Sequence, residues 1–310
     1  MITVGGFNTA IDRLVTLATL EPGSVQRATD VRSYPGGKGL HVAQTIAALG
    51  EPVQLVGLVD TMHRNFITRR MSERGVLFHG VEITDDLRQC LALRESDGRI
   101  TEVLDPGPLL SRATREQLLH TLGRAIDNSE ALVLSGSLPR GFETDTYAQI
   151  VHQTKSGGMP CLVDASGEAL QHVADAGAWL IKPNRDEAMQ LTGQTLDSLD
   201  QAEDFVRVLA ERGIARPVVT LGALGAVGFD SGAVWHASLM VEKTLNAVGS
   251  GDCFLAGLAV AQQRGLLADE ALRLAVACGA ANAMNEETGF VRRADVDALL
   301  GRVQVIRRKV

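Results

Sequence analysis

The amino-acid sequence predicts an α/β protein with a mostly parallel β-sheet that helices cover on both faces. Three observations predict this class. Short apolar runs alternate with amphipathic stretches, glycine-rich turns precede helical stretches near residues 36 and 249, and a hairpin signal at Ser96-Asp97-Gly98 interrupts the alternation. Strands that alternate with helices of this length pair in parallel and bury both faces of their sheet.

Composition narrows the class of function. The chain has 310 residues and a formal net charge of -7, which argues against a general nucleic-acid binder. It contains no apolar run of the roughly 18 residues that a membrane span needs, and its N-terminus lacks the basic segment of a signal peptide. The four cysteines are scattered without a C-x-x-C pair, which is typical of reduced, buried thiols. We therefore expect a cytoplasmic protein that binds neither nucleic acid nor membrane.

The N-terminal third begins with a buried strand at Met1–Gly6, and Asn8–Arg13, which contains Asp12, follows as a loop at the carboxyl end of that strand. The other elements expected here are an extended segment at Val25–Tyr34, helices at Val42–Leu49 and Arg64–Arg74, and strands at Val53–Leu58, Val76–Val81, Arg88–Leu93 and Ile100–Leu104. Residues 13–34 and 86–105, within these approximate limits, are expected to form a small separate sheet that acts as a lid.

The remaining chain alternates regularly between helices and strands. The helices are expected at Thr114–Ile126, Thr144–Lys155, Gly167–Ala174, Asn184–Leu191, Leu199–Arg212, Asp252–Arg264 and Asp269–Asn285, and the strands at Ala131–Leu134, Cys161–Val163, Trp179–Ile181, Pro217–Leu221, Ala226–Phe229 and Ala233–His236. The tail with Arg307, Arg308 and Lys309 is expected to be a solvated end. No linker or repeat interrupts the pattern, so residues 1–310 are expected to form one domain.

The stretch Gly249-Ser250-Gly251-Asp252 carries the strongest chemical signal. A glycine-rich turn that opens a helix presents free N–H groups and favours anions. A carboxylate at this place suits a general base for a hydroxyl, beside an anion hole for a transferring phosphoryl group. Two common nucleotide motifs are excluded, because Arg32 stands where a P-loop requires a glycine and Phe254 stands where a dinucleotide fingerprint requires one.

Three further segments are candidates for the same site. Gly36-Gly37-Lys38-Gly39 brings a cation to another helix start, and both Ser135–Pro139 and Lys182–Glu187 follow a strand. Turn chemistry or helix capping explains each segment alone, and the spacing of Asn184 and Glu187 is that of a capping box. Their shared position at the carboxyl edge of a parallel sheet favours one binding site.

Taken together, these segments resemble the ribokinase/PfkB carbohydrate kinase family over essentially the whole chain. Asn246–Asp252 with Ala256-Gly257 resembles the C-terminal signature of the family, and Gly36–Gly39 with Val42-Ala43 resembles its N-terminal signature. Within the family, the chain is similar to the phosphosugar kinases, which include 1-phosphofructokinase, tagatose-6-phosphate kinase and the minor 6-phosphofructokinase. The residues that support this branch are Asn8–Asp12, Arg88–Cys90, Thr101–Leu104, Gly107-Pro108, Ser135–Pro139, Asp164–Gly167, Lys182–Glu187 and Leu221-Gly222 with Gly225.

The resemblance implies a three-layer α/β/α fold with a β-sheet lid, and MgATP-dependent transfer of the γ-phosphoryl group to a sugar hydroxyl. It implies that Asp252 is the catalytic base and that Gly249, Ser250 and Gly251 form the anion hole. The acceptor side would comprise Asp12, Arg27, Gly37, Lys38, His41, Arg88 and Ser137, with Arg27 and Arg88 near the phosphate of the substrate. The ATP side would comprise Asn184, Thr220, Gly222, Gly225, Gly251 and Asn282, and Glu187 would organise Mg²⁺. A homodimer through the lid is also expected.

One position departs from the pattern of this branch. His41 stands where the branch has an asparagine that contacts the sugar. An imidazole is bulkier and offers one donor when it is neutral, so the sugar specificity could differ, or the ring could replace a single hydrogen bond. The residues do not separate 1-phosphofructokinase from tagatose-6-phosphate kinase activity. A kinase of another sugar and a sensor protein that kept the fold without catalysis stay as alternatives.

Overall fold

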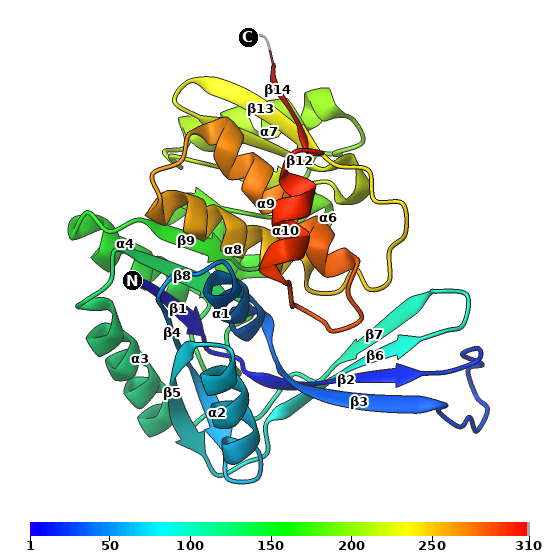
Figure 1. The fold of residues 1–310 in the computed structure, drawn as a ribbon. Helices are drawn as coiled ribbons and strands as arrows, with labels where there is room; N and C mark the ends of the chain where they lie inside the picture. Colours follow the sequence, from blue (N-terminus) through cyan, green and yellow to red (C-terminus); the bar gives the residue numbers. More distant parts are fainter. Residues whose placement is uncertain (309–310) are drawn as a thin grey trace.

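A six-stranded parallel sheet forms the centre of the protein (Figure 1). The computed structural model describes residues 1–308. The strand order is β10-β9-β8-β1-β4-β5, with β1 (Ile2–Gly6), β4 (Val53–Asp60), β5 (Val76–Ile83), β8 (Ala131–Ser135), β9 (Cys161–Asp164) and β10 (Leu180–Ile181). Every residue of β1, β4, β8, β9 and β10 is buried, as expected for parallel strands with both faces covered.

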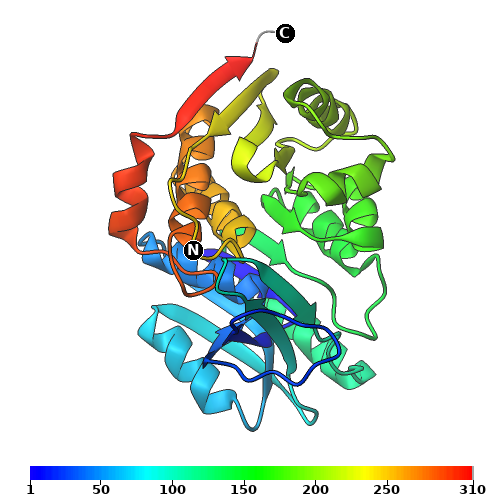
Figure 2. The ribbon, with the colours of Figure 1, turned by 90° about the vertical axis from the view of Figure 1, so that its right-hand side faces the viewer.

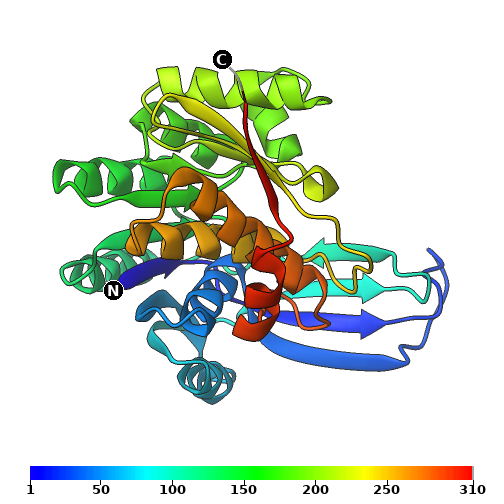
Figure 3. The same ribbon diagram turned by 45° about the horizontal axis from the view of Figure 1, so that its top comes forward.

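A second, antiparallel sheet lies beyond β10. Its order is β11-β12-β13-β14, with β11 (Val218–Thr220), β12 (Ala226–Asp230), β13 (Ala233–Ser238) and β14 (Gln304–Arg308) (Figure 3). A parallel bridge between Asn184 and Thr220 joins it to the region that follows β10.

A third, small sheet projects from the body of the protein (Figures 1 and 3). Its order is β3-β2-β6-β7, with β2 (Ala10–Thr16), β3 (Asp30–Gly36), β6 (Arg88–Arg94) and β7 (Ile100–Leu104). The pairing of β2 with β6 is parallel and the other two pairings are antiparallel. The small sheet expected from the sequence is therefore present, and its strands extend beyond the 13–34 limits to residues 10–16 and 30–36.

Helices cover both sides of the two larger sheets, on the left and right in Figure 2. One side carries α1 (Lys38–Ala48), α2 (Arg64–Glu73), α8 (Ser250–Gln263), α9 (Ala268–Ala283) and α10 (Arg293–Leu300). The other side carries α3 (Arg112–Ile126), α4 (Thr146–Ser156), α5 (Gly167–Ala176), α6 (Arg185–Thr192) and α7 (Leu199–Glu211), and a short 3₁₀ helix at Gly222–Leu224 precedes β12. Within residues 1–308, no helix combines the length and the apolar character that crossing a membrane requires.

Two local predictions near the N-terminus are corrected. Asp12 lies within β2 and not in a loop, because it pairs with Tyr34 of β3 and with Cys90 of β6. Helix α1 begins at Lys38 and not at Val42, so that His41 belongs to its first turn. Pairing with distant strands puts Asp12 in β2, and the local apolar pattern does not report such pairing. Helix α1 begins earlier because Gly37, with a φ of 94°, is its N-cap.

The described part of the tail is largely exposed, as expected for a solvated end, but the sequence did not predict that it forms a strand. Residues Gln304–Arg308 form β14, which pairs antiparallel with β13. Arg308 is bonded to the carboxylates of Asp200, at 3.1 Å, and Glu203, both on α7. The cationic tail is therefore an edge strand whose charge is matched by acidic residues of a neighbouring helix, while Lys309 lies outside the described residues. Helix α10 was also not expected from the sequence.

The start of α1 lies directly on β1. Gly39 on α1 and Gly6 on β1 approach so closely that a Cβ atom at Gly39 would overlap the Cα atom of Gly6. A backbone contact of this kind leaves no flexible side chain that could move aside. The glycine at position 39 therefore sets the depth at which α1, and the residues of its first turn, lie above the edge of the sheet.

We expect G39A to lower the free energy of unfolding by about 1–3 kcal/mol, the cost of overpacking a well-packed interior. The matched control is G123A, because Gly123 lies on α3 and its added Cβ would meet open space. In that helix the same change is expected to raise stability by about 0.5–1 kcal/mol. Urea unfolding of both variants measures the difference, and equal effects would contradict the close contact.

Candidate active site

One cavity of about 1360 Å³ opens at the carboxyl edge of the central sheet, next to the small sheet. Most of the residues expected at the site line it, although they come from segments throughout the chain. They are Asp12, Lys38, His41, Arg88, Ser137, Asn184, Glu187, Thr220, Gly222, Gly225, Gly249, Ser250, Gly251 and Asp252. The structure thus brings together polar groups that follow β1, β8, β9 and β10 with the N-termini of α1 and α8.

The N-terminus of α8 forms one wall of the cavity. Gly249 has a φ of 82°, which lets the chain turn into the helix at Ser250. The N–H of Ser250 donates to the carbonyl of Ala247 at 3.1 Å. Among the hydrogen bonds of the described residues, none uses the N–H of Gly249 or Gly251. These two N–H groups are therefore the ones that remain for an anion, at the positive end of the helix.

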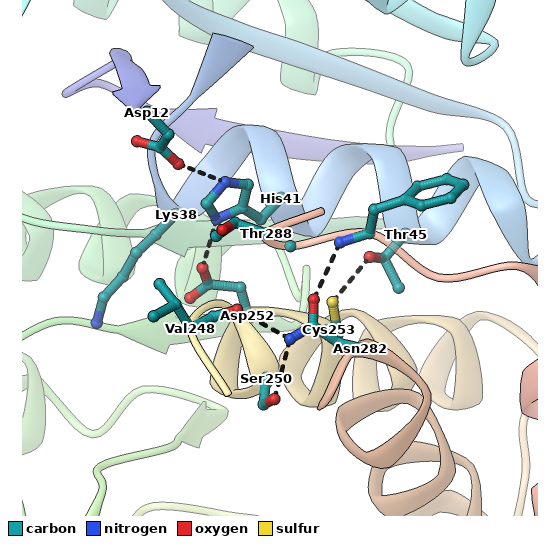
Figure 4. Close-up of polar contacts among 12 residues, drawn as sticks. Asp12, Lys38, His41, Thr45, Val248, Ser250, Asp252, Cys253, Asn282 and Thr288 are labelled. Atoms are coloured by element: carbon teal, nitrogen blue, oxygen red, sulfur yellow. Dashed lines mark hydrogen bonds and ion pairs between the residues drawn. The ribbon is translucent and has the colours of Figure 1, made fainter. Parts of the chain in front are cut away.

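Asn282 holds this turn in place through hydrogen bonds. It is fully buried on α9, and its Nδ2 donates to the carbonyl of Val248 at 2.9 Å and to Oγ of Ser250 at 3.0 Å (Figure 4). Its Oδ1 accepts the N–H of Phe290 at 3.1 Å. The structure therefore places Asn282 behind the anion turn and not on the surface of the nucleotide groove where the sequence predicted it.

Asp252 contacts the residue that departs from the sequence pattern of the phosphosugar kinases. Nδ1 of His41 lies 2.8 Å from Oδ2 of Asp252, and Nε2 of the same ring lies 2.9 Å from Oδ2 of Asp12 (Figure 4). Burial alone would lower the pKa of His41, but the hydrogen bonds and charges of Asp12 and Asp252 raise it to about 10. The imidazole thus joins the expected base to an expected sugar ligand.

A second group of charges lies beside the anion turn. The buried carboxylate of Asp164, at the end of β9, is 3.3 Å from Nζ of Lys38 and 3.1 Å from Nζ of Lys182. Burial opposes ionisation of Asp164, but Lys182 and Lys38 lower its pKa, and Asp164 in turn raises the pKa of Lys38. A Cβ at Gly251 would lie 3.4 Å from Nζ of Lys182, so this ammonium group adds positive charge next to the turn.

Residues at the start of α6 form the opposite wall. Oδ1 of Asn184 accepts the N–H of Glu187 at 2.9 Å, and Oε2 of Glu187 accepts the N–H of Asn184 at 2.8 Å. The capping box suggested by the sequence is therefore present. Capping uses one oxygen of Glu187, while its Oε1 lies 3.9 Å from Nζ of Lys38. A helix cap and a ligand role are thus compatible in the same residue.

The turn around Gly222–Gly225 extends this wall. Thr220 ends β11, and Gly222 and Gly225 have φ values of 60° and 86°. A Cβ at Gly225 would overlap the carbonyl of Ala237, so glycine is required there for the turn itself. The backbone of Gly222 and Gly225 therefore lines the cavity here, and no side chain would fit at Gly225.

On the side of the small sheet, Arg88 and Ser137 face the cavity. Nε of Arg88 donates to the carbonyl of Asn8 at 3.1 Å, and Nδ2 of Asn8 donates to Oγ of Ser137 at 2.9 Å. Gly37, with a φ of 94°, lies behind the cavity wall, where it turns β3 into α1. The structure does not bring Arg27 to the cavity, because this residue is exposed in the loop between β2 and β3.

The sequence placed Lys182 in a candidate segment, but it gave no individual role to six charged residues that line the cavity, namely Asp164, Lys182, Glu102, Arg13, Arg185 and Asp186. A signal existed for the first two, because each directly follows a predicted strand. Glu102 lies on β7 of the small sheet. Burial raises its pKa, and the nearby carboxylates of Asp12 and Asp252 raise it further.

The residues present fit a magnesium ion bound together with phosphate. Mg²⁺ prefers hard oxygen ligands and is usually held by one or two carboxylates together with phosphate oxygens and water. Oε1 of Glu187 is a hard oxygen of this kind and would be available to the ion. Within residues 1–308, no cluster of three or more His, Cys, Asp or Glu side chains is arranged to hold a metal.

The fold and the cavity define an α/β protein with one large cavity that the N-termini of two helices line at the edge of a parallel sheet. Residues 3–293 match the family described as pfkB family carbohydrate kinase, and the chain belongs to this family. It is an ATP-dependent carbohydrate kinase with a ribokinase-like α/β fold.

Several solved structures are similar over the whole chain. Phosphofructokinase-2 from Escherichia coli in complex with fructose-6-phosphate is 25% identical, with a TM-score of 0.87 and coverage of 97% of this chain and 98% of that chain. The tetrameric inhibited form of the same enzyme is 26% identical, with a TM-score of 0.88 and the same coverage. A possible 1-phosphofructokinase from Thermotoga maritima is 19% identical, with a TM-score of 0.89 and coverage of 99% of both chains, and shows the likeness of fold.

Proposed function

We propose that the protein transfers the γ-phosphoryl group of ATP to a hydroxyl of a ketohexose phosphate, with Asp252 as the general base. The observation that carries the proposal is the position of Asp252 in the one cavity described above. Asp252 lines this cavity together with Asp12, Lys38 and Arg88, which would bind the acceptor, and with Asn184, Glu187 and Thr220, which would bind ATP. A hydroxyl bound on one side and a triphosphate on the other would meet at this carboxylate.

In this reaction Asp252 accepts the proton of the sugar hydroxyl as the oxygen attacks the γ-phosphorus. The new O–P bond forms while the bond to the β–γ bridging oxygen breaks, and ADP leaves with that electron pair. Phosphoryl transfer depends mainly on positioning and on neutralising charge. The N–H groups of Gly249 and Gly251 and the ammonium of Lys182 are placed to stabilise the moving phosphoryl group.

ATP would lie along Thr220, Gly222 and Gly225, with its phosphates toward Gly251. Glu187 would hold Mg²⁺ through Oε1, and the ion when bound neutralises phosphate charge. Asn184 keeps this carboxylate in place through the capping box. Closure of the small sheet over the cavity would exclude water and limit the hydrolysis of ATP.

We infer a phosphorylated sugar from the cation at the acceptor side. Arg88 has its guanidinium beside the cavity, and guanidinium groups bind phosphate through paired hydrogen bonds. The similar E. coli structure contains fructose-6-phosphate. A 1-phosphofructokinase and a tagatose-6-phosphate kinase activity are both compatible with this cation, because a ketose can lie in either direction. A kinase of an unphosphorylated sugar would need no cation at this place in the cavity.

A sensor protein without catalysis is the second candidate, and the contact of His41 with Asp252 favours it, because the contact occupies one oxygen of the base. The intact turn at Gly249–Gly251 argues against this function, since a sensor does not need an anion site for phosphoryl transfer. A coupled assay of ADP release distinguishes the two. The sensor function predicts no turnover with any ketose phosphate.

We also propose a cytoplasmic homodimer that forms through the small sheet. Val31 on β3 and Val103 on β7 expose 45% and 54% of their surface on the two edge strands of this sheet, and exposed apolar residues on an edge strand are commonly covered by another chain. The four cysteines are free thiols, which suits a reducing compartment. Sedimentation equilibrium gives the mass of the assembly, and a monomer at all concentrations would contradict the dimer.

We expect D252N to lower kcat by at least about 10²-fold, because a positioned base contributes about 10²–10⁴-fold. The neutral amide keeps the size of the side chain but accepts a proton poorly, so binding of ATP and sugar phosphate should survive. Calorimetry measures binding and the ADP-release assay measures turnover. The control is D204N, which changes an exposed acidic residue of α7 outside the cavity. If D252N retained its activity, Asp252 would not be the general base.

We propose that His41 alters the sugar specificity, and we expect H41N to shift it toward fructose and tagatose phosphates. The smaller amide would free space and the second oxygen of Asp12 for the acceptor. The measurement is kcat/KM over a panel of sugar phosphates with ATP, with the phosphorylated position identified by NMR. The control is H63N, since His63 pairs with Asp60 outside the cavity. An unchanged profile in H41N would contradict altered specificity.

A further inference from the structure

The contacts of His41 require a definite protonation state. Both ring nitrogens face a carboxylate oxygen, Nε2 at 2.9 Å from Asp12 and Nδ1 at 2.8 Å from Asp252. A carboxylate oxygen is an acceptor, whereas a neutral imidazole has one N–H and one lone pair. In the neutral ring one contact would therefore set a lone pair against an anionic oxygen. An imidazolium donates to both carboxylates and removes this conflict.

The surrounding charges lead to the same protonation state. From the elements packed around the ring come Asp12 on β2, Asp252 on α8, Glu102 on β7, Arg88 on β6, and Lys38 on α1 itself. Lys38 forms its ion pair with Asp164, and Arg88 donates to a backbone carbonyl. Among residues 1–308, His41 is the cationic partner that lies within 4.0 Å of Asp12 and of Asp252. Two largely buried carboxylates thus rely on this ring for charge compensation.

The packing around His41 restricts the movement of its ring. A Cβ atom at Gly289 would overlap the His41 ring, so the loop after α9 covers one face of it closely. Nε2 of Gln44 donates to the carbonyl of Gly289 at 2.6 Å and ties this loop to α1. The side chain of His41 is 6% exposed. The ring is therefore enclosed by backbone on one face and by carboxylates at both nitrogens.

We propose that His41 is a positioning residue, held as an imidazolium, that fixes Oδ2 of Asp252 so that Oδ1 faces the acceptor hydroxyl. The inference rests on the proposed function, in which Asp252 is the base. Among the hydrogen bonds of the described residues, none involves Oδ1 of Asp252. The same ring fixes Asp12, so the base and a sugar ligand are oriented by one cation. No bond is made or broken at His41 in the reaction.

Histidine side-chain NMR tests the protonation state without any need for turnover. The chain has seven histidines, and H41N identifies the signal of His41 by its loss. We expect this ring to carry protons on both nitrogens at about pH 8, where a free histidine is neutral. In D12N one anionic partner is gone, so the titration of His41 should move down by at least about one pH unit. A ring with a single N–H at this pH overturns the inference.

Kinetic variants test the positioning. In H41N the amide nitrogen lies where Nδ1 lies and can still donate to Asp252, whereas in H41Q it lies where Nε2 lies and can donate only to Asp12. We expect H41Q and H41A to lower kcat by about 10- to 100-fold, which corresponds to the loss of one hydrogen bond to a charged group. H41N should retain kcat within about threefold for its best acceptor. Equal kcat values for H41N and H41Q overturn the inference.

These outcomes separate the inference from the proposed function. The control H63N removes a different NMR signal and leaves kcat unchanged, since His63 contacts Asp60 outside the cavity. A wild-type protein that turns over while His41 is neutral overturns the inference alone. A wild-type protein that shows the imidazolium but releases no ADP with any acceptor overturns the proposed function, and with it the kinetic role assigned to His41.

Discussion

The packing of the first turns of α1 and α8 against each other at the sheet edge determines where the chemistry of this protein can occur. Each helix is entered through a glycine with positive φ, Gly37 at 94° and Gly249 at 82°. Behind them, Thr45 and Cys253 form a buried contact at 3.3 Å between the same two helices (Figure 4). Because the two N-termini converge, a cation-bearing turn and an anion-binding turn face one cavity. The remaining elements supply the walls around this pair.

The same convergence brings buried charges together, and the structure pairs each of them. Asp164 lies between Lys38 and Lys182, and His41 lies between Asp12 and Asp252. An unpaired charge at this depth would be strongly destabilising. The two groups differ in sign, however, since the first has an excess of cations and the second an excess of carboxylates. This separation suits a reaction in which a phosphoryl group moves toward a hydroxyl that loses its proton.

The features that could be predicted from the sequence were those with a local cause. Glycine turns, polar residues after apolar strands and the capping box of Asn184 and Glu187 depend on neighbours in the chain, and the structure has them where they were expected. Placements set by distant segments could not be read in this way. Pairing with β3 and β6 puts Asp12 in a strand, packing under the anion turn buries Asn282, and the loop that carries Arg27 leads away from the cavity.

The contact of His41 with Asp252 is the clearest case, because 211 positions separate the two residues in sequence. Sequence alone showed that an imidazole replaces an amide, and left open whether it faces the sugar or turns away. In the structure it does something else, since it contacts both Asp252, the proposed base, and Asp12, the proposed sugar ligand. In the proposed reaction its effect on the substrate would therefore be indirect. The acceptor would meet one free oxygen on Asp252, and the ring already holds Asp12, so position 41 would act on the sugar through the orientation of both carboxylates.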